Sequence, residues 1–291
     1  MRVRKVQSQV SPIAILKGRL IAYAVLILLG ILSQAAPLLA SVVYFPLVMV
    51  TPIILVRAFR FRAANSSYRG IRFAFDGLES EAYRVFLLLP VLVPFTLGIL
   101  YPVVMKRQRE FYVAESRYGR AQFGLELPTG AVYRIYLLAF LAFLALGVVA
   151  AGVMFGSMVA AGGPPNPEAP PGPGMVVGFV LLYAGFGAIA VSVRTAFENL
   201  VWNHTRLDVH RFESRLRGRT MLWLYASNVL LIAGTLGLGV PWARVRLARY
   251  RAESLTLVPG GPLATEAMSG SETDAATGAE LSDAMDLDFG L

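Results

Sequence analysis

Residues 20–56 read LIAYAVLILLGILSQAAPLLASVVYFPLVMVTPIILV and contain no Asp, Glu, Lys, Arg or His. A helix needs about 20 apolar residues to cross a bilayer, so this uncharged stretch is too long for a single crossing. Its natural break is SQAAP at Ser33–Pro37, where polar residues meet a helix-breaking proline. The stretch therefore predicts two membrane helices joined by a tight turn.

The chain as a whole has the composition of a membrane protein. Of its 291 residues, 56% are hydrophobic and only 15% are charged, whereas soluble domains carry about 25% charged residues. The other apolar segments are 85–105, 135–161, 175–193 and 221–240, and the Pro- and Gly-rich residues 162–174 must form a loop. The predicted fold class is an all-α multi-pass membrane protein with six hydrophobic segments. The chain has no Cys, which excludes disulfides, thiolate metal sites and cysteine nucleophiles.

Charge separates the C-terminal segment from the rest. Residues 259–291 contain seven acidic residues and no Lys or Arg, so all 27 basic residues lie in 1–258. The segment opens with PGGP and is rich in Ala, Gly, Ser and Thr, which predicts a mostly disordered tail. Its last residues, 285–291, alternate apolar side chains with Asp and Gly, so a short docking strand is the alternative.

Two polar segments resemble each other, and they predict small β-hairpins. Residues 65–73 (NSSYRGIRF) are echoed by 203–212 (NHTRLDVHRF) and more loosely by 115–123 (ESRYGRAQF). Each reads as a turn followed by a short alternating strand. A Thr-Leu-Gly motif begins 23 residues after the Phe of the first two segments, and a Pro follows that Thr by six. This spacing predicts an internal repeat of two halves, 1–126 and 127–258, followed by the tail. The repeated structural residues are Asn65, Ser67, Tyr68, Gly70, Phe73, Thr96, Gly98 and Pro102 in the first half and Asn203, Thr205, Phe212, Thr235, Gly237 and Pro241 in the second.

These motifs resemble the YjgN family of uncharacterised bacterial inner-membrane proteins. The resemblance rests on LKGRL at 16–20, NSSYRGIRF at 65–73, TLG with a following YP at 96–102, and TLG with PWARVRLARY at 235–250, and it covers nearly the whole chain. It implies membership and an inner-membrane location, but no reaction. Family members usually begin with another Thr-Leu-Gly segment and a basic stretch, which this chain lacks ahead of LKGRL.

The basic residues suggest which side of the membrane each loop occupies. They number five in 1–19, six in each of 57–84, 106–134 and 194–219, and four in 242–258. Six full crossings would divide them 15 to 12, whereas two re-entrant Thr-Leu-Gly segments would place all 27 on one side. Lys and Arg concentrate on the cytoplasmic side. We therefore favour re-entry of 85–105 and 221–240, with cytoplasmic hairpins and both termini in the cytoplasm. Two kinked spanning helices forming an inverted repeat are the alternative.

The apolar segments contain no Asp, Glu, Lys, Arg or His, which disfavours a proton-coupled carrier. No nucleophile–base pair, carboxylate pair or metal-ligand pattern occurs there, so we expect neither an enzyme nor a cofactor or metal. We also expect no nucleic-acid binding, and the sequence does not identify a protein partner. Arg244, Arg246, Arg249 and Arg251 are candidate contacts for anionic lipid headgroups. Thr96 and Thr235 line a solute path in one interpretation and make helix–helix hydrogen bonds in the other.

The sequence therefore leaves two functions open. The first, which we favour at this stage, is a passive or facilitated pathway for a small solute, because repeated halves with broken segments are typical of transporters. The alternative is a non-catalytic membrane module that binds anionic lipid or partner proteins through a basic cytoplasmic face.

Overall fold

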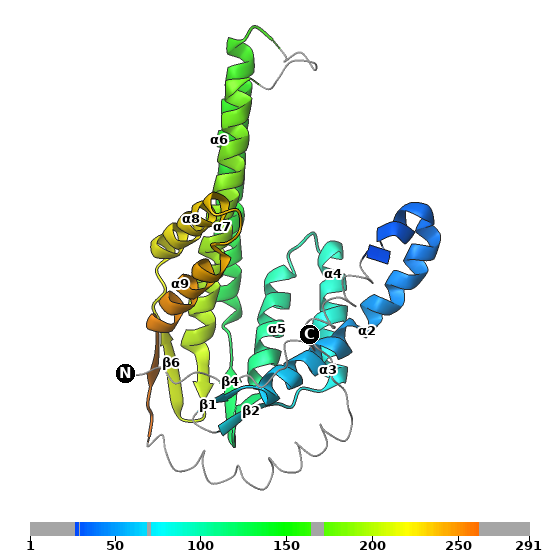
Figure 1. Cartoon of the computed structure of the whole chain (residues 1–291), viewed down its shortest axis with the longest axis vertical. Coiled ribbons are helices and arrows are strands. Elements are labelled where there is room, and N and C mark those ends of the chain that lie inside the picture. Colours follow the sequence, from blue (N-terminus) through cyan, green and yellow to red (C-terminus); the bar gives the residue numbers. More distant parts are fainter. Residues whose placement is uncertain (1–26, 29, 69–70, 164–171, 262–291) are drawn as a thin grey trace. The chain divides into compact units, whose positions relative to one another are not determined.

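The computed structural model describes residues 27–28, 30–68, 71–163 and 172–261 (Figure 1). These residues are mostly helical, with short strands between the helices. They divide into two compact units. The first holds the described residues up to Glu126 together with Thr205–His210 and residues 259–261, and the second holds those of Leu127–His204 and Arg211–Val258. Several predictions lie outside the described residues, namely those for residues 20–26, for Gly70, for most of the Pro-rich loop and for the tail from residue 262 onward.

The first long helix of the described chain is α2, Pro37–Ala64. It is preceded by helical residues at 30–35 and by a break at Ala36, where φ is −149° and ψ is 79°. This break falls within the stretch that the sequence predicts, and proline at the first helical position explains it because the ring suits a helix start. The helix ends at Asn65, whose side-chain Nδ2 donates to the Phe61 carbonyl at 2.9 Å.

In the first unit, α2 leads into strands and then into a broken helical segment. The strands are β1 (Ser67–Tyr68) and β2 (Ile71–Phe75), followed by α3 (Glu79–Tyr83), the π-helical turn η1 (Arg84–Leu88) and α4 (Leu89–Phe95). After a turn at 96–100 the chain continues as α5 (Tyr101–Ala114), β3 (Ser116–Tyr118) and β4 (Ala121–Leu125). Gln108 of α5 donates to the Val85 carbonyl at 3.5 Å, so α5 runs back along η1.

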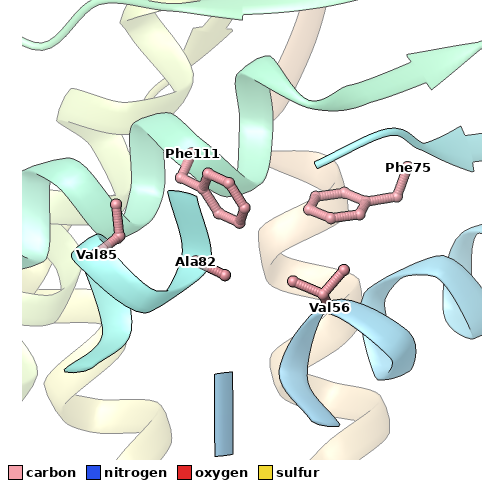
Figure 2. Packing of buried hydrophobic residues seen from close by; sticks show 5 residues of the cluster. All are labelled: Val56, Phe75, Ala82, Val85 and Phe111. Atoms are coloured by element: carbon pink, nitrogen blue, oxygen red, sulfur yellow. The ribbon is translucent and has the colours of Figure 1, made fainter. Parts of the chain in front are cut away.

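The core of this unit is aromatic and aliphatic (Figure 2). Val56, Phe75, Ala82, Val85 and Phe111 form a buried cluster contributed by α2, β2, α3, η1 and α5. The Phe75 and Phe111 ring centroids are 5.8 Å apart with an edge-to-face arrangement, the geometry that aromatic quadrupoles favour. The cluster fixes β2 against the helices on both sides of it in sequence.

The second unit is dominated by two long antiparallel helices. They are α6 (Thr129–Ala160) and α7 (Pro173–His204), which pack along each other (Figure 1). Close packing depends on glycine: a Cβ at Gly178 would overlap Met154, and one at Gly185 would overlap Leu146. Small residues at a helix interface allow close approach in membranes, where no hydrophobic force drives association.

The rest of the second unit is a second helical hairpin between strands. α8 (Gly218–Gly234) follows β6 (His210–Ser214), and α9 (Val240–Glu253) leads into β7 (Leu255–Val258). Between α7 and β6 lies β5, Thr205–Leu207, and Asp208 at the following turn has a φ of 52°. All three predicted hairpin regions therefore contain two strands.

By length and composition, three helices of the described chain could cross a membrane: α2, α6 and α7. This agrees with a membrane protein. The segments 85–105 and 221–240 are not continuous helices, because each is divided by a turn at its Thr-Leu-Gly motif. The predicted break in these two segments is therefore present, although the sequence did not predict that the second limb would be a regular helix extending to Ala114 and Glu253.

Strands from different hairpins pair with one another, which the sequence interpretation of separate small hairpins missed. In the first unit β2 pairs with β3, and β4 pairs with β5; in the second unit β6 pairs with β7, always antiparallel. The register is the same each time, with Phe73 opposite Tyr118, Phe123 opposite Leu207 and Phe212 opposite Leu257. The helices between two paired strands therefore start and end at the same place in the ladder. This holds for α3–α5 between β2 and β3, for α6–α7 between β4 and β5, and for α8–α9 between β6 and β7.

Candidate functional site

The two Thr-Leu-Gly motifs adopt the same reverse turn. Leu97 and Gly98 have φ values of 49° and 84°, and Leu236 and Gly237 have values of 48° and 93°. Two successive residues in the left-handed region end one helix and redirect the chain, and glycine tolerates this at the second position because it has no Cβ. Leucine at the first position bears a strain that a glycine would not.

Each threonine builds this turn with its own hydroxyl group. Thr235 Oγ1 donates to the Leu231 carbonyl at 2.7 Å and accepts from the Gly239 amide at 2.8 Å. Thr96 Oγ1 lies 3.0 Å from the Val93 carbonyl and 3.3 Å from the Leu100 amide. Both hydroxyls thus bridge the end of one helix and the start of the next. Their local bonding favours a turn-forming role over contact with a solute.

The tips of these turns are apolar. Leu97 is 92% exposed and Leu236 is 95% exposed, and Phe95 and Leu238 beside them are exposed as well. Such a tip would be costly in water and is suited to lipid. Pro102 and Pro241 follow in the first turn of α5 and α9, where a missing N–H costs nothing. Pro102 is buried, whereas Pro241 is exposed.

The motif residues of the hairpins have structural roles. Tyr118 donates its hydroxyl to the Tyr68 carbonyl at 2.7 Å and packs its ring 4.9 Å from Phe73. In the second unit, Phe212 packs 5.5 Å from Trp202. Ser67 pairs with Arg72 in the β1–β2 ladder, and Thr205 pairs with Leu125 in the β4–β5 ladder. These residues hold strands together and line no described cavity.

One correction concerns how the two hairpin segments correspond. The sequence comparison places Asn203 opposite Asn65, but the residue that matches Asn65 in the structure is His204. Asn65 Nδ2 bonds the carbonyl four residues earlier, and His204 Nδ1 does the same to Leu200 at 2.8 Å. Asn203 instead accepts the Ser214 amide. Counted back from the shared Phe, His204 lies as far from Phe212 as Asn65 lies from Phe73, whereas Asn203 lies one residue further away.

Asn199 is the main residue that the sequence analysis missed. Its Oδ1 accepts the Ser214 hydroxyl at 2.7 Å and the Leu216 amide at 2.9 Å, and its Nδ2 donates to the Leu216 carbonyl at 2.8 Å. It thereby binds α7 to the link between β6 and α8. In the first unit, Arg60 makes a related contact by donating to the Gly77 carbonyl at 2.9 Å. The sequence did offer a signal for this role, because Asn199 is a polar residue inside a helix, shortly before a hairpin.

The four arginines proposed as headgroup contacts fall into two pairs. Arg246 donates to Asn228 Oδ1 at 3.0 Å, while the same Asn228 donates to the Ala243 carbonyl at 3.3 Å. Arg251 forms an ion pair with Glu198 of α7 at 3.0 Å. These two arginines bind α9 to the rest of its unit.

Arg244 and Arg249, by contrast, are exposed and form no ion pair among the described residues. Arg217 and Arg219 at the start of α8 are also unpaired within the described chain. The Tyr250 hydroxyl accepts the Arg217 amide at 2.9 Å, which brings the start of α8 to the end of α9. We call the four residues Arg217, Arg219, Arg244 and Arg249 the free arginines of the second unit, because each lies at or in α8 or α9 and none forms an ion pair with a described residue. Arginine without a protein partner can bind phosphate oxygens in two parallel hydrogen bonds.

Acidic residues gather near β3 in the first unit. Burial of the carboxyl group raises the pKa of Glu115, and the nearby charges of Glu81 and Asp76 raise it further. Asp76 itself forms an ion pair with Arg117 at 3.0 Å. Among the described residues, no three His, Asp or Glu side chains lie close enough together to hold a metal ion.

Comparison with known proteins gives one family. The family described as "Bacterial protein of unknown function (DUF898)" matches residues 9–284. No curated protein and no solved structure matches the chain.

Proposed function

The chain belongs to this bacterial family, and we propose that it is an integral inner-membrane protein that binds anionic lipid headgroups through a basic cytoplasmic face. In this proposal α2, α6 and α7 cross the membrane together with the helix predicted before Ala36. The two Thr-Leu-Gly hairpins, η1–α4–α5 and α8–α9, enter from the cytoplasmic side and return to it.

The observation that carries the proposed topology is the pairing of the strands that flank each hairpin. β2 precedes the first hairpin and β3 follows it, and Phe73 lies opposite Tyr118 in their ladder. β6 and β7 flank the second hairpin in the same way, with Phe212 opposite Leu257. Paired strands lie about 5 Å apart, whereas a full crossing would separate them by about 30 Å of hydrocarbon. The pairing therefore supports re-entry.

Helix length supports the same topology. At about 1.5 Å per residue, the 17 residues of α8 extend about 25 Å and the 14 residues of α9 extend about 21 Å. Because α9 carries arginine from residue 244 onward, only its first turn suits the hydrocarbon. The lengths of α8 and α9 therefore suit a hairpin that enters the bilayer part of the way, with Leu236 and Leu238 at its tip.

Re-entry also accounts for the charges. With both hairpins returning to their starting side, all 27 basic residues lie in segments on one face, as the positive-inside rule favours for the cytoplasm. The free arginines of the second unit would then lie at the headgroup level, where each basic residue contributes about 1 kcal/mol to binding of an anionic surface.

The matching turns and registers support an internal repeat. The hydroxyls of Thr96 and Thr235 each bond to the carbonyls three and four residues earlier and to the amide four residues later, and the strands around them pair in equivalent registers. A small-solute pathway stays a prediction for this repeat, and the local hydrogen bonds of both threonines do not favour it.

Single cysteines test the topology, because the chain contains none of its own. Ser116→Cys and Glu213→Cys should be protected from an impermeant maleimide in intact spheroplasts and labelled after lysis, whereas Asn166→Cys should be labelled without lysis. Glu213 is preferable to Ser214 because the Ser214 side chain is buried and bonded to Asn199. Labelling of Ser116→Cys in intact cells, with Asn166→Cys protected, contradicts re-entry.

Lipid binding is tested on the purified protein. We expect Arg244→Gln/Arg249→Gln to retain several-fold less phosphatidylglycerol than the parent after stringent washing. Arg244→Lys/Arg249→Lys preserves charge and should restore most of the retention, and phosphatidylcholine serves as the neutral comparison. Equal phosphatidylglycerol retention by the Gln variant and the parent would reject headgroup binding at these arginines.

A further inference from the structure

The strand β7 corresponds to β3 of the first unit, but β3 has a strand on each of its edges and β7 has a described strand on one edge. It pairs with β6 in the register in which β3 pairs with β2: Ser214 lies opposite Leu255, as Phe75 lies opposite Ser116. β3 also pairs on its other edge with β4, through Arg117 opposite Gln122 and Tyr118 opposite Ala121. Among the described strands, β7 pairs with β6 alone. Within the described chain, its outer edge therefore offers backbone donors and acceptors that pair with no other strand, and Leu257 and Val258 are at least a third exposed.

The residues directly after β7 cannot supply the missing partner. After β3 the chain turns at Gly119–Arg120 and forms β4, Ala121–Leu125. After β7 the corresponding residues begin PGGPL at 259–263. Pro262 stands where β4 has Phe123, and proline has no amide to donate to a ladder. Glycine next to it weakens a strand further because it loses the most conformational entropy on ordering.

A sequence that matches β4 occurs later in the chain, at residues 287–291. β4 reads AQFGL at 121–125, and residues 287–291 read LDFGL. The Phe-Gly-Leu triplet is identical, and the preceding residues keep the apolar–polar alternation. In β4 the final Leu125 is 5% exposed and Phe123 is partly buried, so these are the positions that anchor that strand. Asp288 stands where Gln122 donates to the Ala114 carbonyl, which is one contact that the later segment could not reproduce.

We propose that Leu287–Leu291 of this chain docks on the open edge of β7 as the counterpart of β4. The β3–β4 register places Asp288 opposite Thr256 and Leu287 opposite Leu257. The linker runs from Pro259 to Asp286 and is rich in Gly, Ala, Ser and Thr. Linkers of such composition hold a tethered segment at an effective concentration in the millimolar range, and lengthening a loop adds only slowly to the entropy of closing it. Addition of a strand to an exposed edge is a common mode of peptide recognition.

A disulfide between the segment and β7 tests this register in the full chain in detergent. Thr256→Cys/Asp288→Cys places two cysteines opposite each other, at a Cα separation that a disulfide can bridge. The matched control is Thr256→Cys/Leu287→Cys, because a shift of one residue moves the side chain to the other face of the strand. Under mild oxidation, we expect the first pair to form an intramolecular disulfide at least about tenfold faster than the control. Adding Phe289→Pro to the first pair should reduce its rate to that of the control.

Rates within twofold of each other for the two cysteine pairs would overturn the proposal, since a segment that only samples the surface reacts equally at either position. Disulfides that form only between two molecules, with a rate that rises with protein concentration, would overturn it too and assign the edge to a second copy. This test is independent of the proposed headgroup binding, because it measures a disulfide within the chain in detergent, without lipid.

Discussion

Removal of the Asn199 side chain tests the junction on which the second unit depends. In Asn199→Ala, the Leu216 amide and carbonyl lose their partners at 2.9 and 2.8 Å, and the Ser214 hydroxyl loses one at 2.7 Å. Leu216 is 8% exposed and Ser214 is 6% exposed, so water replaces these bonds poorly. An unsatisfied buried polar group costs about 1–3 kcal/mol, and we expect a total of about 2–4 kcal/mol because the costs of neighbouring groups do not simply add.

Hydrogen exchange followed by mass spectrometry measures this locally. Since 1.4 kcal/mol corresponds to a factor of about 10 in an equilibrium constant, a peptide that contains Leu216 should exchange about 30-fold faster or more in Asn199→Ala. Asn203→Ala is the matched control: it removes a single bond to the Ser214 amide from an exposed side chain, and it should accelerate exchange only a few-fold. If exchange of this peptide is unchanged in Asn199→Ala, or is changed no more than in Asn203→Ala, the assigned role of Asn199 is wrong.

Three further predictions concern Gly237, Gly178 and Glu115. Gly237→Ala should destabilise the folded protein by about 1–2 kcal/mol, because φ at Gly237 is 93°. Gly234→Ala, within the helix α8, should be neutral or stabilising. Thermal unfolding in detergent compares the two variants. Gly178→Val should separate α6 from α7, because the added side chain overlaps Met154. The melting temperature of this variant should fall. Gly187→Val is the control and should keep the melting temperature of the parent, because a Cβ there meets no other atom. For Glu115, the folded state has the higher pKa, so it binds the proton more tightly than the unfolded state. Its contribution to stability is therefore lost as pH rises from the ordinary carboxyl pKa through the raised one. Glu115→Gln should be more stable than the parent at pH 7 and equal to it near pH 4, and a difference of the opposite sign at pH 7 would refute the assignment.

The sequence by itself determined the kind of protein and the positions of its main elements. The uncharged stretch at 20–56 and the apolar segments at 135–161 and 175–193 are long and unmistakable, since burial in lipid demands about 20 apolar residues in succession. The strand regions and the breaks at Thr96 and Thr235 were also predicted, because local alternation and turn-forming residues report on the backbone directly.

Tertiary structure decided which strands pair and which polar groups meet. Nothing in the local pattern of Arg72–Phe75 specifies that β2 pairs with β3 across 41 or more residues, because every strand offers the same backbone donors and acceptors. The same reason hid Asn199: its three partners lie 15–17 residues away, so its role exists only once α7 and the β6–α8 link are packed together. Likewise, four arginines of α9 are alike in sequence, but Arg246 and Arg251 are bound inside the unit, while Arg244 and Arg249 are exposed and form no ion pair with a described residue. That distinction depends on which residues of α7 and α8 face each arginine, and a helix cannot specify its neighbours by its own periodicity.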